Sequence, residues 1–218
     1  MEQQDLAVQR SGCILVHMRM LFFAVFGVWL PVLFMSFSAR AEILRYTVMH
    51  RDNEVGQLQI ERTVSKDETR YRFESNVALT MIMKIRVYDM MDVTFHGNLL
   101  TRAYLYRTLN DKVKVRNLAL WDGTRYKLSD RDNEIKTITH PIYFTTASLY
   151  YVEPLQIRNL YSEKFQKMIP VTPDGASRYR LDLPNGNRVF YSYRNGRCSL
   201  VEAQTEWADI RFVLKERL

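Results

Sequence analysis

The sequence contains few of the residues and motifs that mark a catalytic or metal site. Its 218 residues include two cysteines, four histidines and eight glycines. There is no Walker-type loop, G-x-G-x-x-G pattern or G-x-S-x-G elbow, so neither a phosphate cradle nor serine hydrolase chemistry is indicated. The histidines beyond the N-terminal region, His50, His96 and His140, form no H-x-H or H-E-x-x-H pair. We therefore predict no metal site and no cofactor.

The N-terminal region has the pattern of a secretory signal peptide. A basic segment at Met18-Arg19-Met20 precedes the uncharged, apolar residues 21–37, and Ser38-Ala39-Arg40-Ala41 then places small residues where a signal peptidase reads them. Cleavage is expected between Ala41 and Glu42, which would leave residues 42–218 in the periplasm or outside the cell. The alternative is an uncleaved anchor that contacts the membrane through this segment alone, although the apolar run is shorter than the ~20 residues of a relaxed span.

Residues 1–17 do not fit that pattern, because they are polar and mixed in charge ahead of the signal. The total length would also exceed the usual ~15–30 residues of a signal peptide, so we expect translation to begin at Met18 or Met20. Cys13 would then lie outside the protein. Cys198 would be the one cysteine after cleavage, which excludes an intramolecular disulfide and favours a small, partly buried strand residue.

The charge of the chain is basic but dispersed. The formal net charge is +7, and basic residues alternate with aromatic ones, as in Arg70-Tyr71-Arg72-Phe73. This pattern is typical of the solvated outer face of a sheet, and a surface that faces anionic lipid or polyanionic glycan is the alternative. Nucleic acid is not an expected partner, because the exported chain has no basic cluster.

The longest regular pattern runs from Tyr71 to Phe95, where odd positions are mostly apolar and even positions mostly polar or charged. This is the period of a half-buried strand. At ~3.3 Å per residue the stretch would extend roughly 80 Å, so it must fold back, near residues 80–84 or at Asp89. Asp89 falls on the apolar phase, and we interpret it as a turn or bulge; a buried acid with a partner is the alternative.

Shorter alternating runs, separated by Asp-Gly and Asn-Gly pairs such as Asn195-Gly196, predict hairpins in the rest of the chain. Residues 141–152 break the pattern and predict a short helix, capped by Thr145 or Thr146 and ended by Pro154. The sequence therefore predicts an all-β domain over residues 42–218. We expect a long, strongly curved antiparallel meander or half-barrel of about ten to twelve strands around that one helix.

Three groups of residues resemble an uncharacterised family of secreted bacterial β-rich proteins, a domain of unknown function. They are Tyr46-x-Val48 with Val55-Gly56-x-Leu58 and Arg62; Ser148-Leu149-Tyr150-Tyr151-x-Glu153-Pro154; and Tyr179-x-Leu181-x-Leu183-Pro184-Asn185-Gly186 with Tyr191-x-Tyr193 and Asn195-Gly196. The family pattern has a glycine near Gln166. The family is similar in outline to the periplasmic lipoprotein-carrier fold, an open half-barrel that cups apolar ligands around a helical plug. That resemblance implies a fold and does not fix a function.

The candidate site residues come from the centre of the alternating stretch and from the expected helix. Met81 and Met83 lie on the apolar phase, and methionine suits surfaces that accept varied apolar ligands as well as irregular cores. Tyr150, Tyr151 and Glu153 form the most unusual local cluster of the chain. We predict that these five residues contribute to a ligand site.

Three functions fit these observations. A periplasmic binding or carrier module would hold a lipid or other apolar group on the concave face of the sheet, and it predicts an internal cavity. An envelope structural or assembly partner would act by protein–protein contact, and it predicts a filled core with an exposed apolar or basic patch. A glycan- or lipid-acting hydrolase predicts a cleft that brings together carboxylates and a histidine, such as Asp89, Glu153 and His140. We rank the functions in this order and expect no catalysis.

Overall fold

The computed structural model describes residues 40–80, 84–205 and 208–217. These residues form one sheet of fourteen strands. The first eight strands are β1 (Arg40–His50), β2 (Asn53–Val64), β3 (Glu68–Thr80), β4 (Lys84–His96), β5 (Leu99–Leu109), β6 (Lys112–Trp121), β7 (Tyr126–Ser129) and β8 (Ile135–Ile138). The remaining six are β9 (Asn159–Ser162), β10 (Lys167–Pro173), β11 (Arg178–Asp182), β12 (Arg188–Arg194), β13 (Arg197–Gln204) and β14 (Asp209–Arg217).

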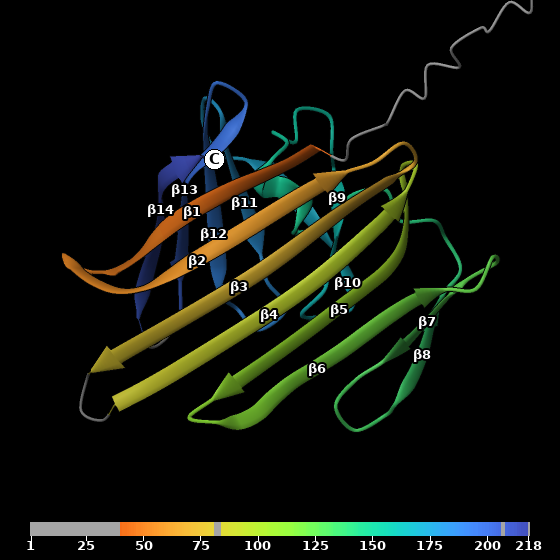
Figure 1. Cartoon of the computed structure of the whole chain (residues 1–218), viewed down its shortest axis with the longest axis horizontal. Coiled ribbons are helices and arrows are strands. Elements are labelled where there is room, and N and C mark those ends of the chain that lie inside the picture. The colour runs from red at the N-terminus through yellow and green to blue at the C-terminus, as the bar shows by residue number, and fades with distance from the viewer. Residues whose placement is uncertain (1–39, 81–83, 206–207, 218) are drawn as a thin grey trace, which may run out of the picture. The chain divides into compact units, whose positions relative to one another are not determined.

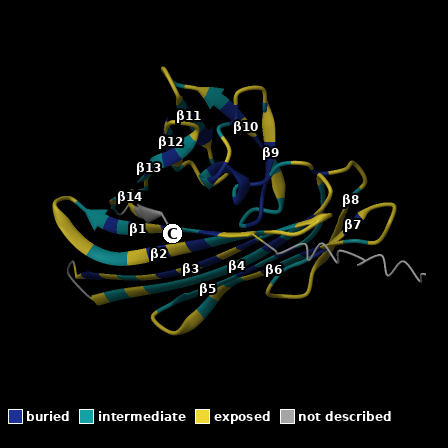
Figure 2. Cartoon of the chain, turned by 45° about the horizontal axis from the view of Figure 1, so that its top comes forward, coloured by how far each residue is buried: buried dark blue, intermediate teal, exposed yellow. Residues whose placement is uncertain are grey.

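All strands of the sheet are antiparallel to their neighbours, and the first strand, β1, lies in the middle of the sheet. The strand order is β8-β7-β6-β5-β4-β3-β2-β1-β14-β13-β12-β11-β10-β9, so β1 pairs with β14 and the sheet stays open at β8 and β9. The long strands β1–β6 curve together, and β9–β14 rise from them as a second wall (Figures 1 and 2). The predicted all-β, curved antiparallel architecture is confirmed. The predicted strand number was too low, because β7, β8 and β9 have only four residues each.

The long alternating stretch folds back as its length requires. β3 and β4 pair from Glu68↔His96 to Thr80↔Lys84, so the reversal falls between Thr80 and Lys84. Tyr71 and Phe73 are buried, whereas the even positions next to them are exposed or half-buried. The interpretation of Asp89 as a turn or bulge was wrong, because Asp89 lies within β4 with regular partners on both sides.

The segment between β8 and β9, residues 139–158, crosses the concave side of the sheet and is called the plug segment below. The short helix expected there was wrong: the segment contains one 3₁₀ turn, Ser148–Tyr150, with Ala147 as its N-cap and no side-chain cap. Its backbone bonds to the sheet instead, because Tyr161 donates to the Phe144 carbonyl and Thr146 donates to the Tyr161 carbonyl. Among the described residues, this turn is the whole helical content, and no helix is long and apolar enough to cross a membrane.

Two hydrophobic clusters meet at the plug segment. One joins the inner face of β1–β7 to Ile142, Ala147 and Tyr151. The other joins the inner face of β9–β13 to Leu149. Tyr150 packs against both clusters, so the plug segment ties the two walls of the sheet together.

Candidate ligand-binding cavity

A cavity of about 410 Å³ lies between the two walls of the sheet. The first wall contributes, from β2–β5, Leu58, Phe73, Val77, Leu79, Met91 and Leu105. The second wall contributes, from β11–β14, Leu181, Val189, Val201, Ala203, Ile210 and Phe212. Thr146 and Tyr150 of the plug segment, and residues 162–165 at the end of β9 and in the β9–β10 turn, also line the cavity. The lining is therefore mostly apolar, because the alternating strands direct their apolar phase inward.

A short row of polar side chains crosses the first wall. Ser75 of β3 is opposite Asp89 of β4, and Asp89 is opposite Arg107 of β5, so the three side chains point to the same face. The Arg107 guanidinium forms a bidentate pair with the Asp89 carboxylate, in which Nη2 donates to Oδ2 at 2.8 Å and Nε donates to Oδ1. Asp89 is therefore a half-buried acid with a partner. This is the alternative that the sequence left open for Asp89.

The β9–β10 turn adds two titratable groups to the lining. The Glu163 carboxylate accepts hydrogen bonds from the Thr146 hydroxyl and, at 3.3 Å, from the Ala147 backbone N–H. Burial raises the pKa of Glu163 above its usual 4.5. Burial and, to a smaller extent, the nearby Arg107 charge lower the pKa of Lys164 to about 8, although the Asp89 charge acts in the opposite direction. The Lys164 Nζ lies 5.1 Å from the centre of the Phe165 ring.

Side chains from the first wall hold this turn in place. The Asn117 amide of β6 donates to the Glu163 and Lys164 carbonyls, both at 2.8 Å. The Gln166 amide donates to the Leu118 carbonyl at 3.2 Å and to a β7 carbonyl at 3.0 Å. Gln166 has φ 51°, a conformation that favours glycine. Its amide bonds fix the strained residue, so the turn is preorganised.

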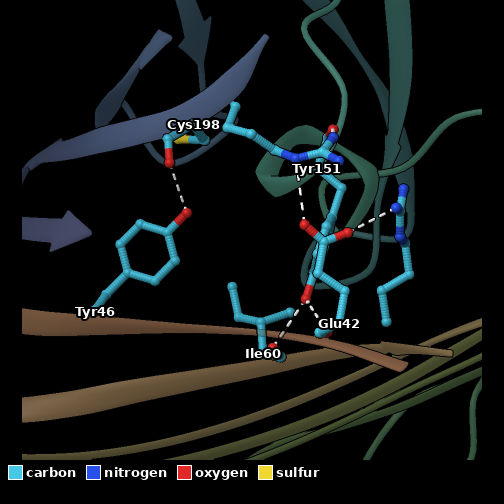
Figure 3. Close-up of polar contacts among 7 residues, drawn as sticks. Glu42, Tyr46, Ile60, Tyr151 and Cys198 are labelled. Carbon is cyan, nitrogen blue, oxygen red and sulfur yellow. Dashed lines mark hydrogen bonds and ion pairs between the residues drawn. The ribbon is translucent and has the colours of Figure 1, made fainter. Parts of the chain in front are cut away.

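The neighbouring tyrosines of the plug segment point to different surroundings. Tyr150 lines the cavity, with ring centres 5.2 Å from Phe73, 5.5 Å from Tyr46 and 5.9 Å from Tyr191. Its hydroxyl has no hydrogen-bond partner among the described residues. Tyr151 is fully buried, and its hydroxyl lies 2.9 Å from the carbonyl oxygens of Glu42 and Ile60 (Figure 3). Tyr151 therefore anchors the plug segment to β1 and β2.

A buried polar cluster surrounds that anchor. The Glu42 carboxylate pairs with Arg62 at 2.7 Å and with Arg197 at 3.4 Å, and Arg197 also donates to the Tyr151 carbonyl. Beside it, the Tyr46 hydroxyl donates to the Cys198 carbonyl at 2.7 Å (Figure 3). Cys198 is fully buried in β13, and burial raises the pKa of its thiol to about 12. This cluster joins β1 to β13 and serves the fold.

The other predicted site residues lie elsewhere. Glu153 is not part of the lining, and its carboxylate accepts a hydrogen bond from the Tyr179 hydroxyl at 3.1 Å. His140 is exposed and Asp89 faces the cavity, so the three groups of the hydrolase hypothesis have separate surroundings. Met81 and Met83 fall outside the described residues.

Several lining residues were missed by sequence reasoning. They are Ser75, Arg107, Glu163 and Lys164. Ser75 lies on the apolar phase of the same stretch as Asp89. The sequence therefore indicated that polar side chains from this stretch point inward. Arg107 and the turn residues had no such signal, because their position depends on the register of β4 with β5 and on contacts of the turn with β6 and β7. The part of the chain that the structure describes contains no group of three His, Cys, Asp or Glu residues arranged to hold a metal ion.

The fold and the cavity define an open, curved, all-antiparallel sheet with a mostly apolar cavity that is partly open to solvent. Residues 46–215 match the family model described as "Domain of unknown function (DUF6134)", and the chain belongs to this family. A similar solved structure is titled "Crystal Structure of Beta-barrel-like Protein of Domain of Unknown Function DUF1849 from Brucella abortus". The TM-score is 0.54 at 13% sequence identity, over 83% of this chain and 99% of that chain, so the likeness concerns the fold. No curated protein matches. The predicted resemblance to an uncharacterised β-rich family is confirmed.

Proposed function

We propose that the protein is an exported, non-catalytic binding or carrier module for an apolar or lipid-like ligand. The observation that carries this proposal is the cavity of about 410 Å³ with its mostly apolar lining. Ligand pockets commonly enclose ~300–1,000 Å³ and combine apolar walls with a few polar groups. A dry cavity of only ~150 Å³ is enough to bind benzene, so this one has room for an acyl segment.

The polar groups of the lining favour binding over catalysis. Asp89 is held by Arg107, and Glu163 is held by Thr146 and the plug backbone. None of the three described histidines lines the cavity. A general acid or base needs a group that is free to exchange a proton with substrate, and both carboxylates here already have fixed partners.

The exported location rests on the signal pattern, and the position of Glu42 is compatible with it. Cleavage between Ala41 and Glu42 would remove only Arg40 and Ala41 from β1. The Glu42 carboxylate, which pairs with Arg62, and the Glu42 carbonyl, which accepts from Tyr151, would remain. Processing at this bond would therefore leave the anchor of the plug segment intact.

Native mass spectrometry of protein purified from a bacterial periplasm tests the proposal, followed by organic extraction and lipid analysis. We expect the mass of residues 42–218 plus one acyl species at near-equal stoichiometry. The Ala203→Trp variant, which fills the cavity from β13, should lose that species. The matched control Ala78→Trp, on the exposed face of β3, should keep it. A ligand-free wild type, or equal loading of both variants, contradicts the proposal.

An envelope assembly partner is the second candidate function. Large apolar side chains are exposed on the plug segment, namely Tyr143 at 61%, Val152 at 41% and Leu155 at 75%. Exposed apolar groups of this kind mark contact surfaces when they gather. Photocrosslinking from position Leu155 in intact cells tests this function, because a specific envelope protein should be trapped there and not from the exposed position Ala78.

A further inference from the structure

The charged groups of the cavity are confined to one side of it. Asp89 and Arg107 come from β4 and β5, and Glu163 and Lys164 come from the β9–β10 turn. The opposite wall, β11–β14, contributes no charged side chain to the lining. A space that is charged at one side and apolar at the other matches a ligand with the same asymmetry.

The two basic groups on that side differ in how they are paired. Arg107 and Asp89 neutralise each other in their bidentate pair. The Glu163 carboxyl is directed to Thr146 and Ala147, and burial favours its neutral form. Lys164 forms no close ion pair within the described ranges, and the nearest carboxylate, that of Asp89, is already bound by Arg107. Burial of an ammonium group without a close ion pair is unfavourable, and burial together with the Arg107 charge lowers the pKa of Lys164, while Asp89 partly offsets this.

We propose that the ligand is an amphiphile with an anionic head group, and that Lys164 and Arg107 hold this head group while the apolar chain lies against β11–β14. The inference rests on the proposed carrier function and names the class of ligand for the same cavity. An oxyanion would supply the counterion that Lys164 lacks. It would also accept from the Ser75 hydroxyl, which lines the same cavity.

The turn that carries Lys164 is built to keep this position. Asn117 bonds to the Lys164 carbonyl, and Gln166 bonds to carbonyls of β6 and β7. A binding group that is held before the ligand arrives loses less conformational entropy on binding. Charge-assisted hydrogen bonds are also about twice as strong as neutral ones. The head group should therefore contribute to affinity as well as to orientation.

Displacement of the neutral fluorophore N-phenyl-1-naphthylamine from purified residues 42–218 tests the inference. The competitors share one chain length: palmitate, hexadecyl phosphate, hexadecanol and hexadecylamine. We expect the two anions to bind about tenfold tighter than the alcohol, since a hydrogen bond to a charged group is stronger than one between neutral groups. The ratio of palmitate to hexadecyl phosphate then distinguishes a carboxylate from a phosphate head group.

Variants of the turn assign the preference to one side chain. Lys164→Met should weaken binding of the anions about tenfold and leave hexadecanol unchanged, whereas Lys164→Arg should retain the preference. Lys167→Met, an exposed position on the same hairpin, is the matched control. Wild-type preference for anions should also fall as pH rises through about 8, where Lys164 loses its charge beside Arg107, Asp89 and Glu163.

The outcomes separate the two proposals. Equal affinity of wild type for palmitate and hexadecanol, or equal weakening of both by Lys164→Met, overturns the head-group assignment and leaves the carrier function standing. Tighter binding of hexadecylamine than of palmitate overturns it as well. Failure of the fluorophore and of every competitor to bind contradicts the carrier function itself.

Discussion

Removing the Tyr151 hydroxyl should destabilise the domain, whereas the same change at Tyr150 should not. Tyr151 is fully buried, and its hydroxyl lies 2.9 Å from two backbone carbonyls, one on β1 and one on β2. Tyr151→Phe keeps the ring and leaves these buried acceptors without that donor. Losing a hydrogen bond of this kind costs about 1–3 kcal/mol of stability. This cost exceeds the net contribution of the bond to folding, because the acceptors stay buried away from water.

Tyr150→Phe is the matched control, one residue away in the same turn. The Tyr150 hydroxyl has no hydrogen-bond partner in the described part of the chain, and the contacts of its ring with Phe73 and Tyr191 survive the change. We expect the free energy of unfolding to change by less than about 0.5 kcal/mol. The two variants differ from wild type by the same single oxygen, so a difference between them reports the hydrogen bonds alone.

Urea unfolding of residues 42–218, followed by tryptophan fluorescence and circular dichroism, measures both variants. Tyr151→Phe should lower the free energy of unfolding by about 2 kcal/mol. In a domain of this size that loss lowers Tm by about 4–8 °C. Equal stability of the two variants would refute the role of Tyr151 as the anchor of the plug segment, as would a larger loss for Tyr150→Phe.

Three further predictions concern the sheet and the β9–β10 turn. Gly56→Ala should cost about 1–3 kcal/mol of stability, because a Cβ there would lie 2.8 Å from the Cα of a β3 residue. The control Gln57→Ala, at the exposed neighbouring position, should cost little in the same urea titration. Since the pKa of Glu163 is raised in the folded state, wild-type stability should fall as pH rises from 4.5, and Glu163→Gln should flatten that slope in unfolding curves taken between pH 4 and pH 8; an unchanged slope would contradict the burial of this carboxyl. Asn117→Ala removes two hydrogen bonds to the turn, so it should reduce stability by about 1–3 kcal/mol. Because it releases Lys164, it should also weaken the binding of palmitate more than the binding of hexadecanol. Equal weakening would show that the turn does not position the head-group site.

The parts of the fold that depend on local alternation were predictable from the sequence. The apolar phase between Tyr71 and Phe95 identified both the inner face of β3 and β4 and the need for a reversal between them. The Asn195-Gly196 pair adopts positive φ at both residues, as a tight hairpin between β12 and β13 requires. These features follow from neighbours in the chain, so one sequence is enough to show them.

The plug segment was not predictable in the same way. A threonine cap and the Pro154 stop indicated a helix, but the backbone partners of Phe144 and Thr146 lie on β9. Tertiary hydrogen bonds thus replaced the local ones that a helix would have used. A sequence window contains no information on a partner strand more than ten positions away, and short strands add little alternation of their own.

The candidate site was predictable only where it interrupts a pattern. Tyr150 lies in the cavity, and Asp89 was noticed because it breaks an apolar phase. Arg107 and Lys164 each look like ordinary surface residues of a strand and a turn. Their inward position arises from the register of β4 with β5 and from the bonds that hold the β9–β10 turn. Only the folded sheet brings these residues to one side of one cavity.

Anomalous diffraction from crystals of residues 42–218 grown with 12-bromododecanol tests the central claim most directly, because bromine marks the position of a neutral chain. We predict a single strong bromine peak in the cavity, in contact with Phe73, Val201 or Phe212. Ala203→Trp crystals should lack that peak. A cavity that stays empty of bromine in wild type, with peaks only on exposed surfaces such as those of Tyr143 and Leu155, would contradict the claim that this domain is built to hold an apolar ligand.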